Sequence, residues 1–305
     1  MKKIFLLIAY CFLFLVGCQT EETTLSILVP NGIPSIAQSQ LEYDDNVYDV
    51  ERVSGAQPLS AAFLNNTHDI IIAPINLGAN LYQKGATYQL AGVLTWSNLQ
   101  IISRTPIQSL SDLEGQEIIA FGQGAIPEII LTYLFEQADL ANSTTINYDA
   151  TSVQESLLTF MQGADYAVVS EPVTSQVLSL DETVYIFDLA NPWSTTTGLS
   201  DFPQAGVFVS QSLQNKQIND YLSDLEDATN KAIDNPEEIA ALCSLMDYPF
   251  EESLITISLP KSHIDFQTST IAKDAIDDML NLIYNENKAL IGNNLPDEGW
   301  LYLDS

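Results

Sequence analysis

Two short glycine-bearing loops are the first candidates for chemistry in this chain. One contains Asn31 and Gly32, and the other contains Gly122, Gln123 and Gly124. Each follows an apolar, strand-like segment and precedes a helical one. Such loops expose backbone N–H groups, which can donate hydrogen bonds to a bound polar or anionic group. Glycine also lets a ligand approach the backbone closely. The alternative is that both loops are only tight turns.

Two longer passages share one order of features: a helical stretch, a tight turn, an aspartate, a buried strand and a proline. The first covers residues 59–74 and the second covers residues 152–172. In the second, Ser152 can cap the helix while Glu155 reaches back to it. A repeat array would need at least three units, so two occurrences predict two similar α/β lobes instead.

No set of residues suited to catalysis is visible. His68 and His263 are the two histidines, and neither stands at metal-ligand spacing from another His or Cys. Neither Gly-x-Ser-x-Gly nor Gly-x-x-x-x-Gly-Lys occurs. Arg52 and Arg104 are the only arginines available to bind a strong anion bidentately. The sequence therefore predicts neither an enzyme nor a metal or cofactor site.

The first residues have the features of an export signal. Lys2 and Lys3 precede an apolar run over residues 4–16, which is too short to span a bilayer. Gly17 and Cys18 follow, and small residues before a cysteine at this place resemble the bacterial lipobox. We expect residues 1–18 to be a lipoprotein signal peptide, Cys18 to carry lipid, and residues 19–24 to be a tether. The alternatives are an ordinary signal peptide or an uncleaved anchor.

Composition excludes further classes. The chain has 40 acidic and 10 basic residues and a net charge of −30, so repulsion excludes nucleic acid as a partner. The acidic residues are spread along the chain, which is typical of a solvated surface. Of the three cysteines, Cys11 lies in the leader and Cys18 is the lipid candidate. Cys243 is then alone, and its apolar neighbours predict a core residue.

The elements that must position these loops alternate along the chain. Strand-like segments are separated by helical ones, which predicts an α/β protein with largely parallel sheets. Residues 90–96 and 99–103 form strand material crossing between lobes. After residue 209 the chain becomes mainly helical, with helices expected over residues 218–233, 236–245 and 270–284. In the last of these, an apolar stripe that begins at Ile271 is expected to face the core.

Taken together these residues resemble the type II periplasmic-binding-protein fold, in the group that binds nitrate, sulfonates, taurine or thiamine-pyrimidine precursors. The matching passages are residues 25–34, 69–76, 109–125, 162–172 and 291–297. The resemblance implies two Rossmann-like lobes joined by two crossing strands. Lobe one would combine residues 25–103 with 207–305, and lobe two would be residues 104–206. It also implies a monomeric, extracytoplasmic solute-binding component of an ABC importer, held at the membrane by lipid and partnered by a permease.

In that fold the ligand lies between the lobes, at the carboxyl ends of parallel strands. The resemblance therefore places the two glycine loops, the ends of the two similar strands and two aromatic residues in the cleft. These candidate ligand-binding residues are Asn31, Gly32, Pro74, Asn76, Trp96, Gly122, Gln123, Gly124, Glu171 and Trp193. For the glycine loops a plain turn, and for each tryptophan a core position, stays an alternative.

The cleft side chains favour a small, partly planar solute that is neutral or cationic. A buried carboxylate at Glu171 needs a partner, which a ligand amine or protonated ring nitrogen would supply. Family members that bind sulfonates also have a Glu-Pro pair here, with helix N-termini holding the anion, so a sulfonate stays an alternative. Two other functions stay open, namely a ligand-sensing lipoprotein and a pyrimidine- or menaquinone-pathway enzyme of the same fold.

Overall fold

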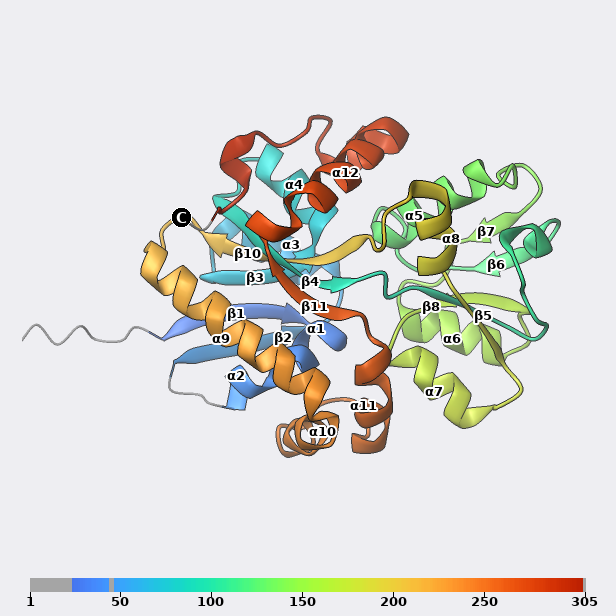
Figure 1. The fold of residues 1–305 in the computed structure, drawn as a ribbon, viewed down its shortest axis with the longest axis horizontal. Coiled ribbons are helices and arrows are strands. Elements are labelled where there is room, and N and C mark those ends of the chain that lie inside the picture. Colours follow the sequence, from blue (N-terminus) through green and yellow to red (C-terminus); the bar gives the residue numbers. More distant parts are fainter. Residues whose placement is uncertain (1–23, 44–46, 304–305) are drawn as a thin grey trace, which may run out of the picture.

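Two lobes lie side by side, each built around its own β-sheet (Figure 1). This computed structural model describes residues 24–43 and 47–303. The expected signal peptide, the lipid site at Cys18 and all of the tether except Thr24 lie outside the described residues. Within the described ranges, no helix is both long and apolar enough to cross a membrane.

The first lobe contains a six-stranded sheet in the order β11-β4-β10-β3-β1-β2. Strand β1 pairs in parallel with β2 and β3, and β10 runs antiparallel to both β3 and β4. The strands are β1 (Leu25–Pro30), β2 (Tyr48–Val53), β3 (Ile70–Pro74), β4 (Tyr88–Trp96), β10 (Pro203–Ser210) and β11 (Ile264–Thr268).

Helices cover both faces of this sheet because its central strands are apolar on both faces. In β3, Ile71 packs into the core under one set of helices, whereas Ile70 and Ile72 pack into the core under the other. The first set is α3 (Ala56–Asn65), α4 (Ile75–Gln83) and α12 (Ser269–Asn287). The second includes α1 (Ile33–Ala37), α2 (Ser39–Tyr43), α9 (Asn215–Asp234), α10 (Pro236–Leu245) and α11 (Glu252–Ser258).

Cys243 is buried in this second core, as the sequence predicted, and burial raises the pKa of its thiol to about 11.

The second lobe contains a five-stranded sheet in the order β7-β6-β8-β5-β9. Strand β6 runs parallel to β7 and β8, while β5 is antiparallel to β8 and β9. The strands are β5 (Gln100–Ser103), β6 (Glu117–Ile119), β7 (Thr145–Asn147), β8 (Tyr166–Val169) and β9 (Tyr185–Asp188). The helices are α5 (Ile126–Gln137), α6 (Val153–Met161), α7 (Val173–Leu180) and α8 (Ala190–Thr197). Short 3₁₀ helices η1 (Leu110–Leu113), η2 (Leu259–Lys261), η3 (Lys288–Ile291) and η4 (Glu298–Trp300) complete the chain.

The chain crosses between the lobes at two places that are bonded to each other. The backbone N–H of Ser97 donates to the carbonyl oxygen of Phe202 at 3.0 Å, and the N–H of Phe202 donates to Ser97 Oγ at 2.9 Å. Strand β5 pairs with strands of the second sheet, and β10 begins at Pro203. The pairing thus puts the crossings at residues 97–99 and 199–202, earlier than the expected boundaries at 103 and 206.

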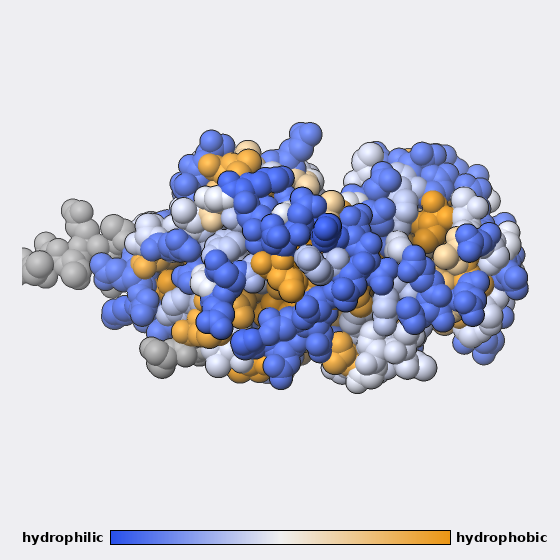
Figure 2. Space-filling model, turned by 90° about the horizontal axis from the view of Figure 1, so that it is seen from above, coloured by the Kyte–Doolittle hydropathy of each residue, from blue (hydrophilic) through white to orange (hydrophobic). Residues whose placement is uncertain are grey.

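The late helices form where the sequence predicted them, as α9, α10 and α12. The expected stripe on α12 is buried at Ile276, Met279 and Ile283 but not at its first member. Ile271 is 71% exposed, because it lies in the first turn of the helix, beside a surface cavity. Seen from above, the surface is mainly hydrophilic, with apolar residues in small separate groups (Figure 2).

Candidate functional site

The predicted loops open from strand ends that face each other across the two lobes. In the first lobe the loops follow the parallel strands β1 and β3, and in the second they follow β6 and β8. Carboxyl ends of neighbouring parallel strands meet at one edge of a sheet, so each lobe brings its two loops to a single edge.

Asn76 and Gly124, both predicted from sequence, contact each other directly across the lobes. Asn76 Nδ2, in the first turn of α4, donates to the carbonyl oxygen of Gly124 at 3.1 Å. The Asn76 side chain is buried with the residue 3% exposed, and its Oδ1 has no hydrogen-bond partner. An unpaired buried amide oxygen costs free energy unless something donates to it. This contact joins two of the loops that the sequence placed in the cleft.

The loop at residues 122–125 needs its glycines for shape. Gly122 has φ 79°, and a Cβ there would lie 2.7 Å from Cγ of Pro127. Gly124 has φ 76° and donates its N–H to Glu128 Oε2 at 2.5 Å. Both positive φ angles belong to the left-handed region, which glycine adopts without steric cost. Gln123 between them is exposed. The loop is therefore wound tightly onto the first turn of α5.

Asn31 and Gly32 form a similar but shorter turn after β1. Asn31 is exposed, and its Nδ2 donates to Ser54 Oγ at 3.0 Å, which ties the ends of β1 and β2 together. Gly32 has φ 120° with open space where a Cβ would stand. Pro74 is half-buried at the end of β3 and precedes the first residue of α4. These residues shape the first-lobe edge, and Asn31 is partnered within its own lobe.

Glu171 is buried and hydrogen-bonded inside the second lobe. It is 5% exposed, and its two carboxylate oxygens accept from the N–H and the Oγ of Ser175, each at 3.0 Å. Its backbone N–H donates to Asn98 Oδ1 at 2.8 Å. Burial raises the pKa of Glu171, although Ser175, Lys261 and His263 act in the opposite direction. Ser175 thus supplies the hydrogen-bond partner that the sequence analysis expected a ligand to provide.

The two tryptophans have different surroundings. Trp193 is 1% exposed and packs edge-on against Tyr133 and Phe202, with ring centroids 5.9 and 5.3 Å away. It belongs to a core that continues between the lobes. Trp96 is 6% exposed and donates its Nε1 to the carbonyl oxygen of Asp265 at 2.7 Å. It also lines a surface cavity, so Trp96 is the more accessible of the pair.

That cavity has a volume of about 370 Å³ and lies beside the second crossing. Its charged lining consists of Asp201, His263, Asp265, Asp274 and Asp278. The ring nitrogens of His263 lie 3.7 Å from carboxylate oxygens of Asp188 and Asp201. A hydrogen bond from the His263 ring to Asp188, together with the nearby negative charges, raises the pKa of His263 despite its partial burial.

Several residues of this region were not predicted from sequence: Asn98, Glu128, Tyr148 and Ser175. Tyr148 follows β7, and its hydroxyl is buried without a hydrogen-bond partner. Burial and the neighbouring Glu128 raise the pKa of Tyr148. Glu128 and Ser175 both lie in first turns of helices that follow strands, so the rule that found the glycine loops could have found them. Asn98 gave no such signal.

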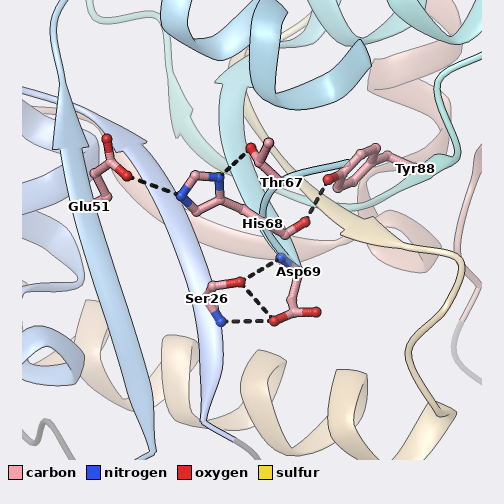
Figure 3. A network of polar contacts seen from close by, with 6 residues as sticks. All are labelled: Ser26, Glu51, Thr67, His68, Asp69 and Tyr88. Carbon is pink, nitrogen blue, oxygen red and sulfur yellow. Dashed lines mark hydrogen bonds and ion pairs between the residues drawn. The ribbon is translucent and has the colours of Figure 1, made fainter. Parts of the chain in front are cut away.

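The polar network around His68 (Figure 3) lies at the amino ends of β1 and β3, whereas the candidate loops follow their carboxyl ends. Asp69, just before β3, accepts at Oδ2 from the N–H of Ser26 at 2.9 Å and from its Oγ at 2.8 Å. His68 contacts Thr67 and Glu51 instead of Ser26. A Ser-His-Asp triad would need the imidazole between the serine and the carboxylate. The network therefore fixes β3 against β1 and has no catalytic geometry.

The described residues offer the cleft neither a metal-ligand cluster nor an arginine without other partners. Among the described residues no group of three or more His, Cys, Asp or Glu could hold a metal ion. Arg52 pairs with Glu42 at 3.2 Å and stacks on Tyr248. Arg104 donates to the carbonyl oxygens of Phe160 and Ala164 within the second lobe. Both guanidinium groups are engaged elsewhere.

Comparison with known proteins gives matches in structure alone. No family model and no curated protein match the sequence. An ABC transporter from Parabacteroides distasonis matches with TM-score 0.82 and 25% identity, over 93% of this chain and 100% of that chain. The periplasmic aliphatic sulphonate binding protein SsuA from Escherichia coli matches with TM-score 0.71 and 17% identity, over 92% of each chain. The alkanesulfonate-binding protein SsuA from Xanthomonas axonopodis pv. citri, bound to MOPS, has TM-score 0.64 and 17% identity, over 90% of this chain and 94% of that one.

These matches extend across both sheets, as their coverage requires. Two lobes, two crossings and loops at the carboxyl ends of parallel strands are features that the resemblance implied. The sheets are mixed instead of largely parallel, because five of the nine strand pairings in the described residues are antiparallel. The chain therefore has the two-lobed type II periplasmic-binding-protein fold, and its structural neighbours are binding proteins of ABC transporters.

Proposed function

We propose that this protein is the solute-binding component of an ABC importer. It captures a small organic solute between its lobes and delivers it to a membrane permease. The observation that carries the proposal is the hydrogen bond from Asn76 to Gly124, which joins loops of opposite lobes at the edge where a ligand would lie. A solute that contacts both loops favours the closed arrangement, since it binds that arrangement better than the open one.

Hinge closure is supported by the way the lobes are connected. In the described part of the chain, the crossings between the sheets are residues 97–99 and 199–202, and Ser97 and Phe202 bond these crossings into one short unit. Rotation about this unit would separate Asn76 from Gly124 while leaving each sheet intact. The protein would act as a monomer, because both walls of the cleft come from one chain.

Export and anchoring are part of the proposal and rest on the sequence. The apolar run over residues 4–16 and Gly17 precede Cys18, which would carry lipid and hold the protein outside the cytoplasm at the membrane. A polar tether then leads to β1. A protein anchored in this way would stay close to the permease and would not diffuse away. An enzymatic role is not proposed, because the structural neighbours reported above are transporter binding proteins.

The test is to identify the solute and follow the lobes. Full-length protein is purified from membranes in detergent and denatured, and the released small molecules are identified by mass spectrometry. The same solute is then added to the unloaded protein, and X-ray scattering is measured. We expect one dominant solute, a smaller radius of gyration on binding, and loss of its uptake by cells that lack the protein. Absence of any bound solute together with unchanged scattering would contradict the proposal.

A further inference from the structure

Two helices of the second lobe begin at the cleft edge. Helix α5 follows β6 and helix α7 follows β8, and these strands are parallel neighbours. The start of an α-helix carries unpaired N–H groups and a partial positive charge, which favour a bound anion. A cleft that held a sulfonate or phosphate would be expected to keep these groups available.

At α5 a carboxylate of the protein lies beside the start of the helix. The N–H of Gly124 donates to Glu128 Oε2 at 2.5 Å, and the N–H of Ala125 donates to the carbonyl oxygen of Gly122 at 3.0 Å. Pro127 has no N–H to offer. The carboxylate of Glu128 thus stands where an anionic ligand of α5 would stand.

A carboxylate also lies at the start of α7, from the opposite direction along the chain. Glu171, one residue before the N-cap Pro172, accepts from the N–H of Ser175 at 3.0 Å and is buried. Each of these two helices therefore begins beside a carboxylate of its own lobe. Both arginines are bonded elsewhere, and the cations that act on Glu171 are Lys261 and His263.

Two buried polar atoms without hydrogen-bond partners also favour a positively charged solute. Asn76 donates one amide N–H to Gly124, and its amide also presents an acceptor, Oδ1, which is buried and unpartnered. The Tyr148 hydroxyl, close to Glu128, is also buried and unpartnered. Asn76 and Glu128 both bond to Gly124. A group that donates N–H bonds and carries positive charge would complete the free acceptor and the carboxylate together.

We propose that Glu128 determines specificity by excluding anions from the start of α5 and selecting a solute with an ammonium, amidinium or protonated ring nitrogen, to which Asn76 Oδ1 accepts a hydrogen bond. This inference rests on the proposed function, because it requires a solute in the cleft. It also separates this chain from the sulfonate-binding proteins that share its fold, since a sulfonate would meet a like charge at Glu128.

The test compares Glu128→Gln with Glu155→Gln. Glutamine keeps an oxygen that can accept from Gly124, so the fold is retained while the charge is lost. Glu155 is a matched control, because it accepts from the N–H of Thr151 at 2.6 Å in the first turn of α6 and is fully exposed. The probes are benzylamine with benzylsulfonate and butylamine with butanesulfonate, each pair sharing one carbon skeleton. Binding of each probe is measured by equilibrium dialysis against full-length protein.

We expect wild type and Glu155→Gln to retain the amines over the sulfonates. Glu128→Gln should lower amine retention about tenfold, which is the usual size of a lost charge-assisted hydrogen bond. Preference for sulfonates, retention of neither class, or no effect of Glu128→Gln would overturn the inference. The solute released from purified protein provides a second, independent test: an anionic solute without N–H donors would overturn this inference and leave the proposed function standing.

Discussion

Asn76 of the first lobe and Gly124 of the second are joined by a hydrogen bond of 3.1 Å between the side-chain amide and the backbone carbonyl. This bond exists only when the lobes are together, so it reports on closure. It also leaves the amide oxygen of Asn76 pointing to no partner among the described residues. The position of the loop that contains Gly124 and the position of the Asn76 side chain are therefore linked by this bond.

Replacing Asn76 with alanine should favour the open arrangement. One neutral hydrogen bond contributes about 0.5–1.5 kcal/mol, which corresponds to a two- to about tenfold weaker affinity for the bound solute. Scattering should show a larger radius of gyration for Asn76→Ala than for wild type. Asn80→Ala is the matched control, because Asn80 donates to Ala289 within the first lobe at 2.9 Å. Equal effects of the two variants would contradict a role in closure.

Asn98 should matter for stability more than its place in a crossing suggests. Its Oδ1 accepts from the buried N–H of Glu171. Asn98→Ala leaves that donor unsatisfied, which costs about 1–3 kcal/mol of the free energy of unfolding. Urea unfolding measures the loss. Asn65→Ala removes a bond to the carbonyl oxygen of Ala61 on an exposed helix, and it should change the free energy by less. A smaller effect at Asn98 than at Asn65 would show that the crossing tolerates the orphaned donor.

The sequence was sufficient to predict the α/β, two-lobed fold, because apolar strands, turn glycines and helix caps are local signals. The passages ending at Pro74 and Pro172 became β3 and β8, each followed by a helix. The sequence could not assign β5 to its sheet. Residues 100–103 are buried on both faces, and burial does not say which strands they pair with; the partners β8 and β9 lie far along the chain, at residues 166–169 and 185–188.

The candidate site could likewise be predicted only in part. The loop at Gly122 and Gly124 was predicted, since glycine marks positive φ angles. The bond between Asn76 and Gly124 was not, because it joins residues 48 positions apart in the sequence. For Glu171 the sequence indicated a buried carboxylate but not its partner. Whether these residues bind a solute stays a prediction.

Cys18 should carry lipid. Replacing Cys18 with serine removes the thiol that would be acylated, so the protein should leave the membrane fraction or fail to mature. Fractionation and intact-mass measurement check both outcomes. Cys11→Ser, within the apolar run, serves as the control and should change neither. Unchanged membrane association and mass in Cys18→Ser would refute lipid attachment.

His263 should make the association of the lobes depend on pH. It lies in the first lobe, and one ring nitrogen is 3.7 Å from Asp188 of the second lobe while the other is 3.7 Å from Asp201 at a crossing. These carboxylates raise the pKa of His263 above its usual value. A raised pKa in the folded state means that protonated His263 stabilises the fold. That contribution is complete below the unfolded value of about 6.5 and is lost as the pH rises through the folded one.

We therefore expect the difference in melting temperature between wild type and His263→Gln to be largest near pH 5.5 and to shrink as the pH rises through neutrality. The side chain of His263 is 31% exposed, so solvent and salt screen its ion pairs, and 0.5 M NaCl should reduce the difference. Asp188→Asn removes the strongest partner while keeping the histidine, and it should flatten the same pH dependence. Melting curves of wild type and His263→Gln that stay parallel from pH 5.5 to 8.5 would show that the imidazole carries no linkage between the lobes.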